Sequence, residues 1–274
     1  MTSYPSSVLI VGAGDLGLAL AAEFVGTGAV VTTLNRSGRG TDGATSWRGD
    51  LSDPSTLRGL PSSDLVVFTT APPGRDEAAY ELAYVDGPRR VLDALGDSPR
   101  RAVLTSTTGV YGIDDGSWVD EHSAAEPTRA TASAVLRGEL ALHHAVPTVV
   151  VRPAGIYGPG RTGLQNRVAA GEETVARDGT PRWTNRIHRD DVVSALLAAA
   201  TAHDPPPTLI AVDDEPAPRD DVVRFLAARL DAPAPAIMDV TQESGKCCRN
   251  TALRSLGWAP EFPSYREGYS SLLR

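Results

Sequence analysis

The chain has 274 residues and a formal net charge of −8, a length that suits one large α/β domain or a domain with a smaller lobe. The acidic balance argues against a nucleic-acid partner, because few cations are available to neutralise a row of phosphates. No apolar run is long enough to span a membrane, and the first one begins at Val8, too early for a signal peptide. The two cysteines, Cys247 and Cys248, are neighbours that do not suit a disulfide. These features predict a cytoplasmic protein.

Short apolar runs alternate with helical patterns through the first half of the chain. The predicted strands cover residues 8–11, 29–34, 64–69, 101–106 and 147–152, and the predicted helices cover 18–24, 53–60, 77–95 and 130–144. Continuous apolar runs are typical of strands that are covered on both faces of a parallel sheet. The alternation therefore predicts an α/β fold with right-handed crossovers and a doubly wound parallel sheet of the Rossmann type.

The pattern changes beyond residue 153. Residues 161–181 are rich in glycine and arginine, and two predicted helices, 190–202 and 219–230, flank a predicted strand at 208–212. We expect a first domain over residues 1–153 and a smaller C-terminal lobe over 154–274 that is partly interleaved with the main sheet.

A glycine pattern follows the first predicted strand. The strand runs directly into Gly12-Ala-Gly14-Asp-Leu-Gly17 and then into a helical stretch. In this context Gly12 permits a tight turn, Gly14 lets a pyrophosphate approach the backbone, and Gly17 lets the helix pack against the strand. The alternative is a tight strand-to-helix turn without a ligand. We expect a dinucleotide at this loop, with contacts from Gly12, Gly14, Asp15, Leu16 and Gly17.

The end of the second predicted strand bears on which dinucleotide binds. NAD sites usually place a carboxylate there to hold the ribose hydroxyls, whereas this chain has Asn35-Arg36-Ser37. Arg36 and Ser37 offer hydrogen-bond donors for a 2′-phosphate. The alternative is that they are solvated loop residues. We expect NADP(H) in preference to NAD(H), with Asn35, Arg36 and Ser37 in its site.

Four further segments carry a family resemblance. They are Arg48-Gly-Asp50-Leu51, Ser106-Thr107-Thr108-Gly109-Val110-Tyr111, Arg152-Pro153-Ala-Gly-Ile156-Tyr157 and Arg186-Ile-His188-Arg-Asp190-Asp191. With the glycine loop, they resemble the extended short-chain dehydrogenase/reductase family, and within it the NAD-dependent epimerase/dehydratase-like proteins of the atypical branch. The resemblance runs nearly end to end and implies a Rossmann domain with a C-terminal substrate lobe. The additional cofactor contacts that it implies are Asp50, Leu51, Thr70, Ala71, Pro72 and Pro153.

The family's usual acid/base pair, a tyrosine followed four residues later by a lysine, is missing. Its positions fall near Thr131 and Val135, and Lys246 is the only lysine in the sequence. The nearest analogue is Tyr157-Gly-Pro-Gly-Arg161, but arginine is not an equal replacement for the compact ammonium of lysine. Another group would have to exchange the proton.

Several other side chains are candidates for chemistry. Thr107 holds the position of the family's catalytic serine or threonine, where it either bonds a substrate oxygen or caps the strand end. Tyr111 would contact the substrate or donate a proton, and His188 would act as a base or cap the following helix. We take Thr107 and Tyr111 as the catalytic candidates. Those for substrate binding are Thr108, Tyr157, Arg161 and His188. We expect no metal site.

Three functions remain open. The first is hydride transfer between NADP(H) and a small carbonyl or sugar-like substrate by an oxidoreductase or epimerase-like enzyme. The second is a catalytically silent NADP(H)-binding sensor or scaffold, and the third is non-redox isomerisation or dehydration. We expect a small-molecule substrate and either a monomer or a homodimer, the latter pairing through residues 77–95 and 130–144.

Overall fold

The computed structural model describes residues 4–273. Their contacts divide the chain into two compact units. The first unit contains residues up to Val110 together with 125–152 and 193–209, and the second contains 111–124, 153–192 and the residues from Ile210 onward. The chain therefore passes between the units several times rather than once.

A seven-stranded sheet is the framework of the first unit. Its spatial order is β12-β7-β5-β4-β1-β2-β3. The strands are β1 (Ser7–Val11), β2 (Val30–Asn35), β3 (Thr45–Arg48), β4 (Leu65–Phe68), β5 (Arg101–Thr105), β7 (Thr148–Pro153) and β12 (Thr208–Ala211). The pairing is parallel, with Val8 opposite both Val31 and Leu65. Strands β1, β4 and β5 are almost completely buried because helices cover both faces, as their apolar runs predict.

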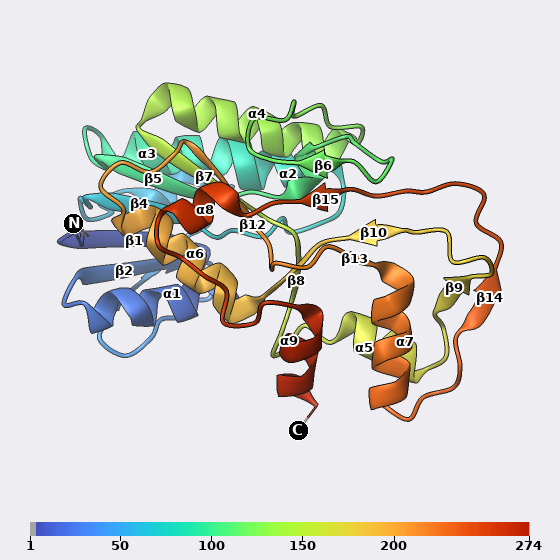
Figure 1. The fold of residues 1–274 in the computed structure, drawn as a ribbon. Coiled ribbons are helices and arrows are strands. Elements are labelled where there is room, and N and C mark those ends of the chain that lie inside the picture. Colours follow the sequence, from blue (N-terminus) through green and yellow to red (C-terminus); the bar gives the residue numbers. More distant parts are fainter. Residues whose placement is uncertain (1–3, 274) are drawn as a thin grey trace. The chain divides into compact units, whose positions relative to one another are not determined.

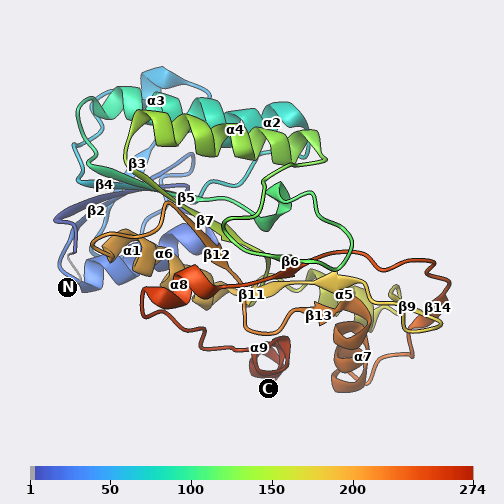
Figure 2. The same cartoon turned by 45° about the horizontal axis from the view of Figure 1, so that its top comes forward.

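Helices lie on both faces of this sheet. Figures 1 and 2 show α1 (Asp15–Gly26) on the same face as α6 (Arg189–Thr201), which belongs to this unit from Val193 onward. The opposite face carries α4 (Ala130–Ala145) and a continuous helical run made of α2 (Glu77–Glu81), the π-helical segment η2 (Leu82–Asp86) and α3 (Gly87–Leu95). The predicted Rossmann doubly wound sheet is confirmed.

One local prediction is wrong, and one strand was not predicted. The helix predicted over 53–60 is only a 3-10 turn, η1 (Pro54–Leu57), because Asp53 and Pro54 start it and Gly59 turns out of it with φ +82°. Strand β3 was not predicted, since Thr-Ser-Trp-Arg contains no apolar run and lies at the exposed edge of the sheet.

The second unit is built from short elements. Its strands are β6 (Trp118–Val119), β8 (Gly155–Tyr157), β9 (Thr174–Ala176), β10 (Trp183–Thr184), β11 (Arg186–His188), β13 (Ala217–Pro218), β14 (Ala236–Met238) and β15 (Cys247–Cys248). They form two-stranded pairs: β10 with β13, β11 with β8, β14 with β9 and β15 with β6. Its helices are α5 (Gly163–Ala169), α7 (Arg219–Arg229), α8 (Thr251–Ser255) and α9 (Tyr265–Leu272). The core includes Tyr157, Val222, Leu226, Tyr265 and Tyr269.

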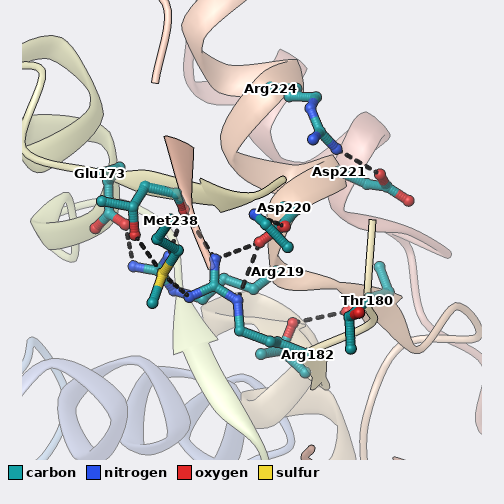
Figure 3. A network of polar contacts seen from close by, with 12 residues as sticks. Glu173, Thr180, Arg182, Arg219, Asp220, Asp221, Arg224 and Met238 are labelled. Carbon is teal, nitrogen blue, oxygen red and sulfur yellow. Dashed lines mark hydrogen bonds and ion pairs between the residues drawn. The ribbon is translucent and has the colours of Figure 1, made fainter. Parts of the chain in front are cut away.

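Buried acids hold the arginine-rich stretch of this unit in place (Figure 3). Asp220, at the start of α7, accepts a hydrogen bond from the backbone N–H of Ala176 in β9 (2.6 Å) and from Nε of Arg182 (3.2 Å). Glu173 is paired with Arg167 (2.8 Å) and with Arg219. Arg182 and Arg219 therefore fasten α7 to β9 and the residue before it, and Arg167 links α5 to that same residue. Within residues 4–273, no helix is both long and apolar enough to cross a membrane.

Candidate functional site

The glycine loop has the geometry that its three positions predict. Gly12 has φ +95°, and a Cβ there would lie 2.7 Å from the backbone nitrogen of Thr70. A Cβ on Gly17 would collide with the carbonyl oxygen of Gly12, so the helix approaches the strand closely. Gly14 is exposed, and apart from its own neighbours in the chain no atom of the described residues comes within 4 Å of where its Cβ would be. The loop thus leaves open backbone at the N-terminus of α1, where no side chain caps the helix.

The loop after β2 is shaped by one side chain. Oδ1 of Asn35 accepts hydrogen bonds from the backbone N–H groups of Ser37 (3.1 Å) and Arg39 (2.9 Å), and Nδ2 donates to the carbonyl of Arg39 (2.6 Å). The amide is therefore committed to the loop itself. Arg36 and Ser37 are exposed on this loop. The Ser37 hydroxyl donates to Oδ1 of Asn35 (2.8 Å), so the guanidinium of Arg36 is the group that can bind a phosphate monoester here.

Asp50 and Leu51 follow β3. Asp50 accepts hydrogen bonds from the N–H (2.8 Å) and hydroxyl (2.7 Å) of Ser52, and these bonds, assisted by the charge of Arg36, lower the pKa of the Asp50 carboxyl despite its partial burial. Asp50 is consequently an ionised acceptor at neutral pH. Among the other predicted cofactor contacts, Ala71 is exposed after β4, whereas Pro153 is buried at the end of β7.

The segment after β5 carries Thr107. Its Oγ1 accepts a hydrogen bond from the N–H of Gly109 (3.0 Å), so the hydroxyl does stabilise the local turn. That bond uses a lone pair of the oxygen and leaves its proton to donate. The preceding residue, Ser106, donates to the buried carboxylate of Glu139, which also accepts from Nε of Arg152 (3.1 Å). Ser106, which precedes Thr107, is therefore held by its hydrogen bond to Glu139, and Thr108, which follows Thr107, is buried.

The structure shows which residues occupy the two positions of the family's missing acid/base pair. Thr131 and Val135 both lie on α4, and Val135 is completely buried, so its position contributes packing rather than charge. The ammonium of Lys246 donates instead to the backbone carbonyls of Tyr111 (2.7 Å) and Ile113 (3.3 Å), within the second unit. The lysine therefore supports the segment that starts at Tyr111.

Three predicted site residues are buried in the second unit. Tyr111 is 1% exposed. Tyr157 packs its ring 4.4 Å from that of Tyr269 and donates from its hydroxyl to the carbonyl of Ser264 (3.5 Å), and burial raises its pKa. His188 accepts the N–H of Asp190 at Nδ1 (3.3 Å), which confirms that it caps the helix that follows.

The tautomer of His188 follows from that bond. Burial lowers the pKa of the imidazole, so the ring is neutral at pH 7, and because Nδ1 accepts a hydrogen bond, the proton resides on Nε2. Arg161, the third predicted substrate-binding residue in this unit, is exposed. The structure leaves the substrate contacts of Tyr157, Arg161 and His188 as predictions.

One buried titratable group, Asp213, was not predicted from the sequence. Asp213 is 2% exposed just beyond β12, and burial raises its pKa to about 8 although the Arg186 guanidinium acts in the opposite direction. It belongs to the acidic run Asp213-Asp-Glu215, which resembles an ordinary surface loop. The only signal was its position directly after a predicted strand. Within the described part of the chain, no cluster of three or more metal-ligating side chains occurs.

Comparison with known proteins places this geometry in a family. Residues 8–212 match the model of the NAD dependent epimerase/dehydratase family. A solved structure from Methylobacillus flagellatus, provisionally described as a NAD-dependent epimerase/dehydratase, is 33% identical, with 99% of this chain and 98% of that chain covered and a TM-score of 0.85. A conserved protein of unknown function from Silicibacter pomeroyi DSS is 28% identical, with 97% and 98% covered and a TM-score of 0.76.

More distant structures share the fold. The UDP-glucose 4-epimerase of Thermotoga maritima, solved with UDP-glucose, is 19% identical, with 98% of this chain and 100% of that chain covered and a TM-score of 0.79. None of the curated proteins compared with this chain matches it. The family model, the similar Methylobacillus structure and the glycine-loop geometry agree: the chain belongs to the NAD dependent epimerase/dehydratase family.

Proposed function

We propose that this protein is an NADP(H)-dependent oxidoreductase or epimerase-like enzyme that acts on a small carbonyl or sugar-like substrate. The observation that carries the cofactor part is the exposed pair Arg36 and Ser37 on a loop where the usual carboxylate is replaced by Asn35. The open backbone at Gly14 would accommodate the pyrophosphate, and the ionised Asp50 would accept hydrogen bonds from the adenine side. A bound nicotinamide would supply or accept a hydride.

Thr107 is our candidate for the group that holds the substrate oxygen. Its hydroxyl accepts the N–H of Gly109 and keeps its proton available, so it can donate to an oxygen on which negative charge develops. Tyr111, four residues further along the chain, is our second candidate, and either its phenol or a bound water would complete the proton transfer. Two solved relatives, named for UDP-glucose and UDP-glucuronic acid complexes, support a sugar-like substrate class.

The test is turnover of a carbonyl and sugar panel by the purified chain. With NADPH or NADP⁺ present, a substrate should change the absorbance of the nicotinamide at a rate that depends on protein concentration. For an epimerase, in which the cofactor is regenerated, product analysis by NMR replaces the absorbance measurement. Tight nucleotide binding with no turnover of any compound would argue against this function.

A second function is favoured by one observation. Val135, at the position of the family's lysine, is completely buried, so an apolar side chain takes the place of that cation. Such a replacement suits an NADP(H)-binding sensor or scaffold that has lost the chemistry. A sensor should bind NADPH and NADP⁺ with different affinities and produce no turnover.

A further inference from the structure

The helical run from Glu77 to Leu95 contains a proline in its interior. Pro88 has no backbone N–H, so it cannot donate to the carbonyl four residues earlier. The run accommodates it with the π-helical segment Leu82–Asp86, after which the N–H of Gly87 donates to the carbonyl of Leu82, five residues back.

This arrangement deprives Ala83 of both possible partners in its own helix. Its α-helical donor would be Gly87, whose N–H is used by Leu82, and its π-helical donor would be Pro88, which has none. The carbonyl of Ala83 instead accepts a hydrogen bond from the hydroxyl of Thr70 (3.1 Å). A carbonyl freed by the proline thus becomes the anchor of the loop that follows β4.

Thr70 is directly next to the glycine loop. A Cβ on Gly12 would lie 2.7 Å from the backbone nitrogen of Thr70, and the neighbouring Thr69 donates from its hydroxyl to the carbonyl of Gly12 (2.8 Å). Fixing Thr70 therefore fixes the surface on which the first turn of the glycine loop rests.

The same helix also reaches the loop after β3. Nη1 of Arg90 donates to the carbonyl of Leu51 (2.6 Å), and a Cβ on Gly87 would meet the Leu51 side chain at 2.8 Å. Leu51 and Thr70 belong to separate loops. Leu51 is held by Arg90, which lies two positions after Pro88, and Thr70 is held by the Ala83 carbonyl that Pro88 frees.

We propose that the proline-induced π turn is a positioning device for the dinucleotide site, in which Ala83 sets the loop beside the glycines and Arg90 sets the loop beside the adenine. The inference rests on the proposed NADP(H) function. Thr70 and Arg90 act as positioning residues through these two backbone carbonyls. Their contributions should be separable, because each holds a different part of the site.

The test measures NADPH and 2′,5′-ADP binding by calorimetry, since the second ligand carries only the adenine half. Thr70→Val should weaken NADPH binding about fivefold to tenfold, the value of one lost hydrogen bond, and should weaken 2′,5′-ADP less, because that ligand carries only one of the two phosphates that the glycine loop would hold. Thr70→Ser should restore NADPH affinity. Arg90→Met should weaken both ligands, whereas Arg89→Met, which removes an exposed arginine paired with Asp86 and Asp93 of the same helical run, should weaken neither.

Pro88→Ala gives an independent test, because we expect this variant to change nucleotide affinity without destabilising the fold. The new N–H can close the helix and satisfy Ala83, so thermal stability should be kept or raised while NADPH affinity falls. Equal NADPH affinity in wild type, Thr70→Val, Arg90→Met and Pro88→Ala would overturn the inference and leave the proposed function intact. A wild-type protein that binds no nicotinamide nucleotide would contradict the proposed function, and the inference with it.

Discussion

At the scale of single residues, Thr107 is the side chain on which the proposed chemistry depends most. Replacing it by valine keeps the shape but removes the proton that would bond the substrate oxygen. We expect Thr107→Val to lower kcat at least about a hundredfold, as the loss of one oxyanion donor does, with little change in NADPH affinity. Thr107→Ser is the matched control and should retain most of the activity. Unchanged turnover in the valine variant would show that another group holds the oxygen.

Arg36 should decide between the two nicotinamide nucleotides. Arg36→Ala removes the exposed guanidinium on the loop that Asn35 shapes, and the 2′-phosphate would lose a charged hydrogen bond. We expect NADPH affinity to fall about tenfold or more and NADH affinity to stay within about twofold, measured by nicotinamide fluorescence. Arg58→Ala, at another exposed arginine of the same unit, is the control for charge alone. A parallel loss for both nucleotides would refute a phosphate-specific contact.

At the scale of elements, two glycines of the β1–α1 turn have different roles, one in nucleotide binding and one in stability. Gly14 has a negative φ and open space at its Cβ, so Gly14→Ala should change the free energy of unfolding by less than about 0.5 kcal/mol while obstructing the pyrophosphate. Gly17→Ala places a methyl group against the Gly12 carbonyl and should destabilise by about 1–3 kcal/mol. Thermal unfolding and NADPH titration of both variants check this. Equal losses of stability would contradict the separate roles.

How far the sequence predicts each element depends on whether its cause is local. The β1–α1 unit was predictable because the strand, turn glycines and helix are contiguous, and the cap formed by His188 follows from its distance to Asp190. Strand β3 was not predictable, because its stability comes from pairing with β2 rather than from its own apolar residues. The anchor between Thr70 and Ala83 combines a loop, a proline and a change of helix type, which no single pattern contains.

In the candidate site, too, features with a local cause were predictable and features with a non-local cause were not. The glycine roles and the missing lysine could be read from the sequence, since they concern residue types at fixed spacing. The high pKa of Asp213 could not, because burial by distant segments causes it.

At the scale of the whole molecule, that buried carboxyl makes stability depend on pH. Its pKa in the folded protein, about 8, lies above its ordinary value of 3.8, so the folded state holds the proton more tightly than the unfolded chain does. The resulting stabilisation is complete below pH 3.8 and is lost as the pH rises through about 8. We expect the melting temperature of the wild type to fall more between pH 6 and pH 9 than that of Asp213→Asn, whose amide cannot ionise. Parallel curves would contradict a buried, protonated Asp213.

The most direct test of the central claim is a titration of the purified protein with NADPH, NADP⁺, NADH and NAD⁺, followed by calorimetry or nicotinamide fluorescence. We expect saturable binding with a clear preference for the phosphorylated pair, because Arg36 and Ser37 are exposed on a loop where Asn35 stands in place of the usual carboxylate. Absence of binding to all four nucleotides would contradict it, since the open backbone at Gly14 would then serve the fold alone.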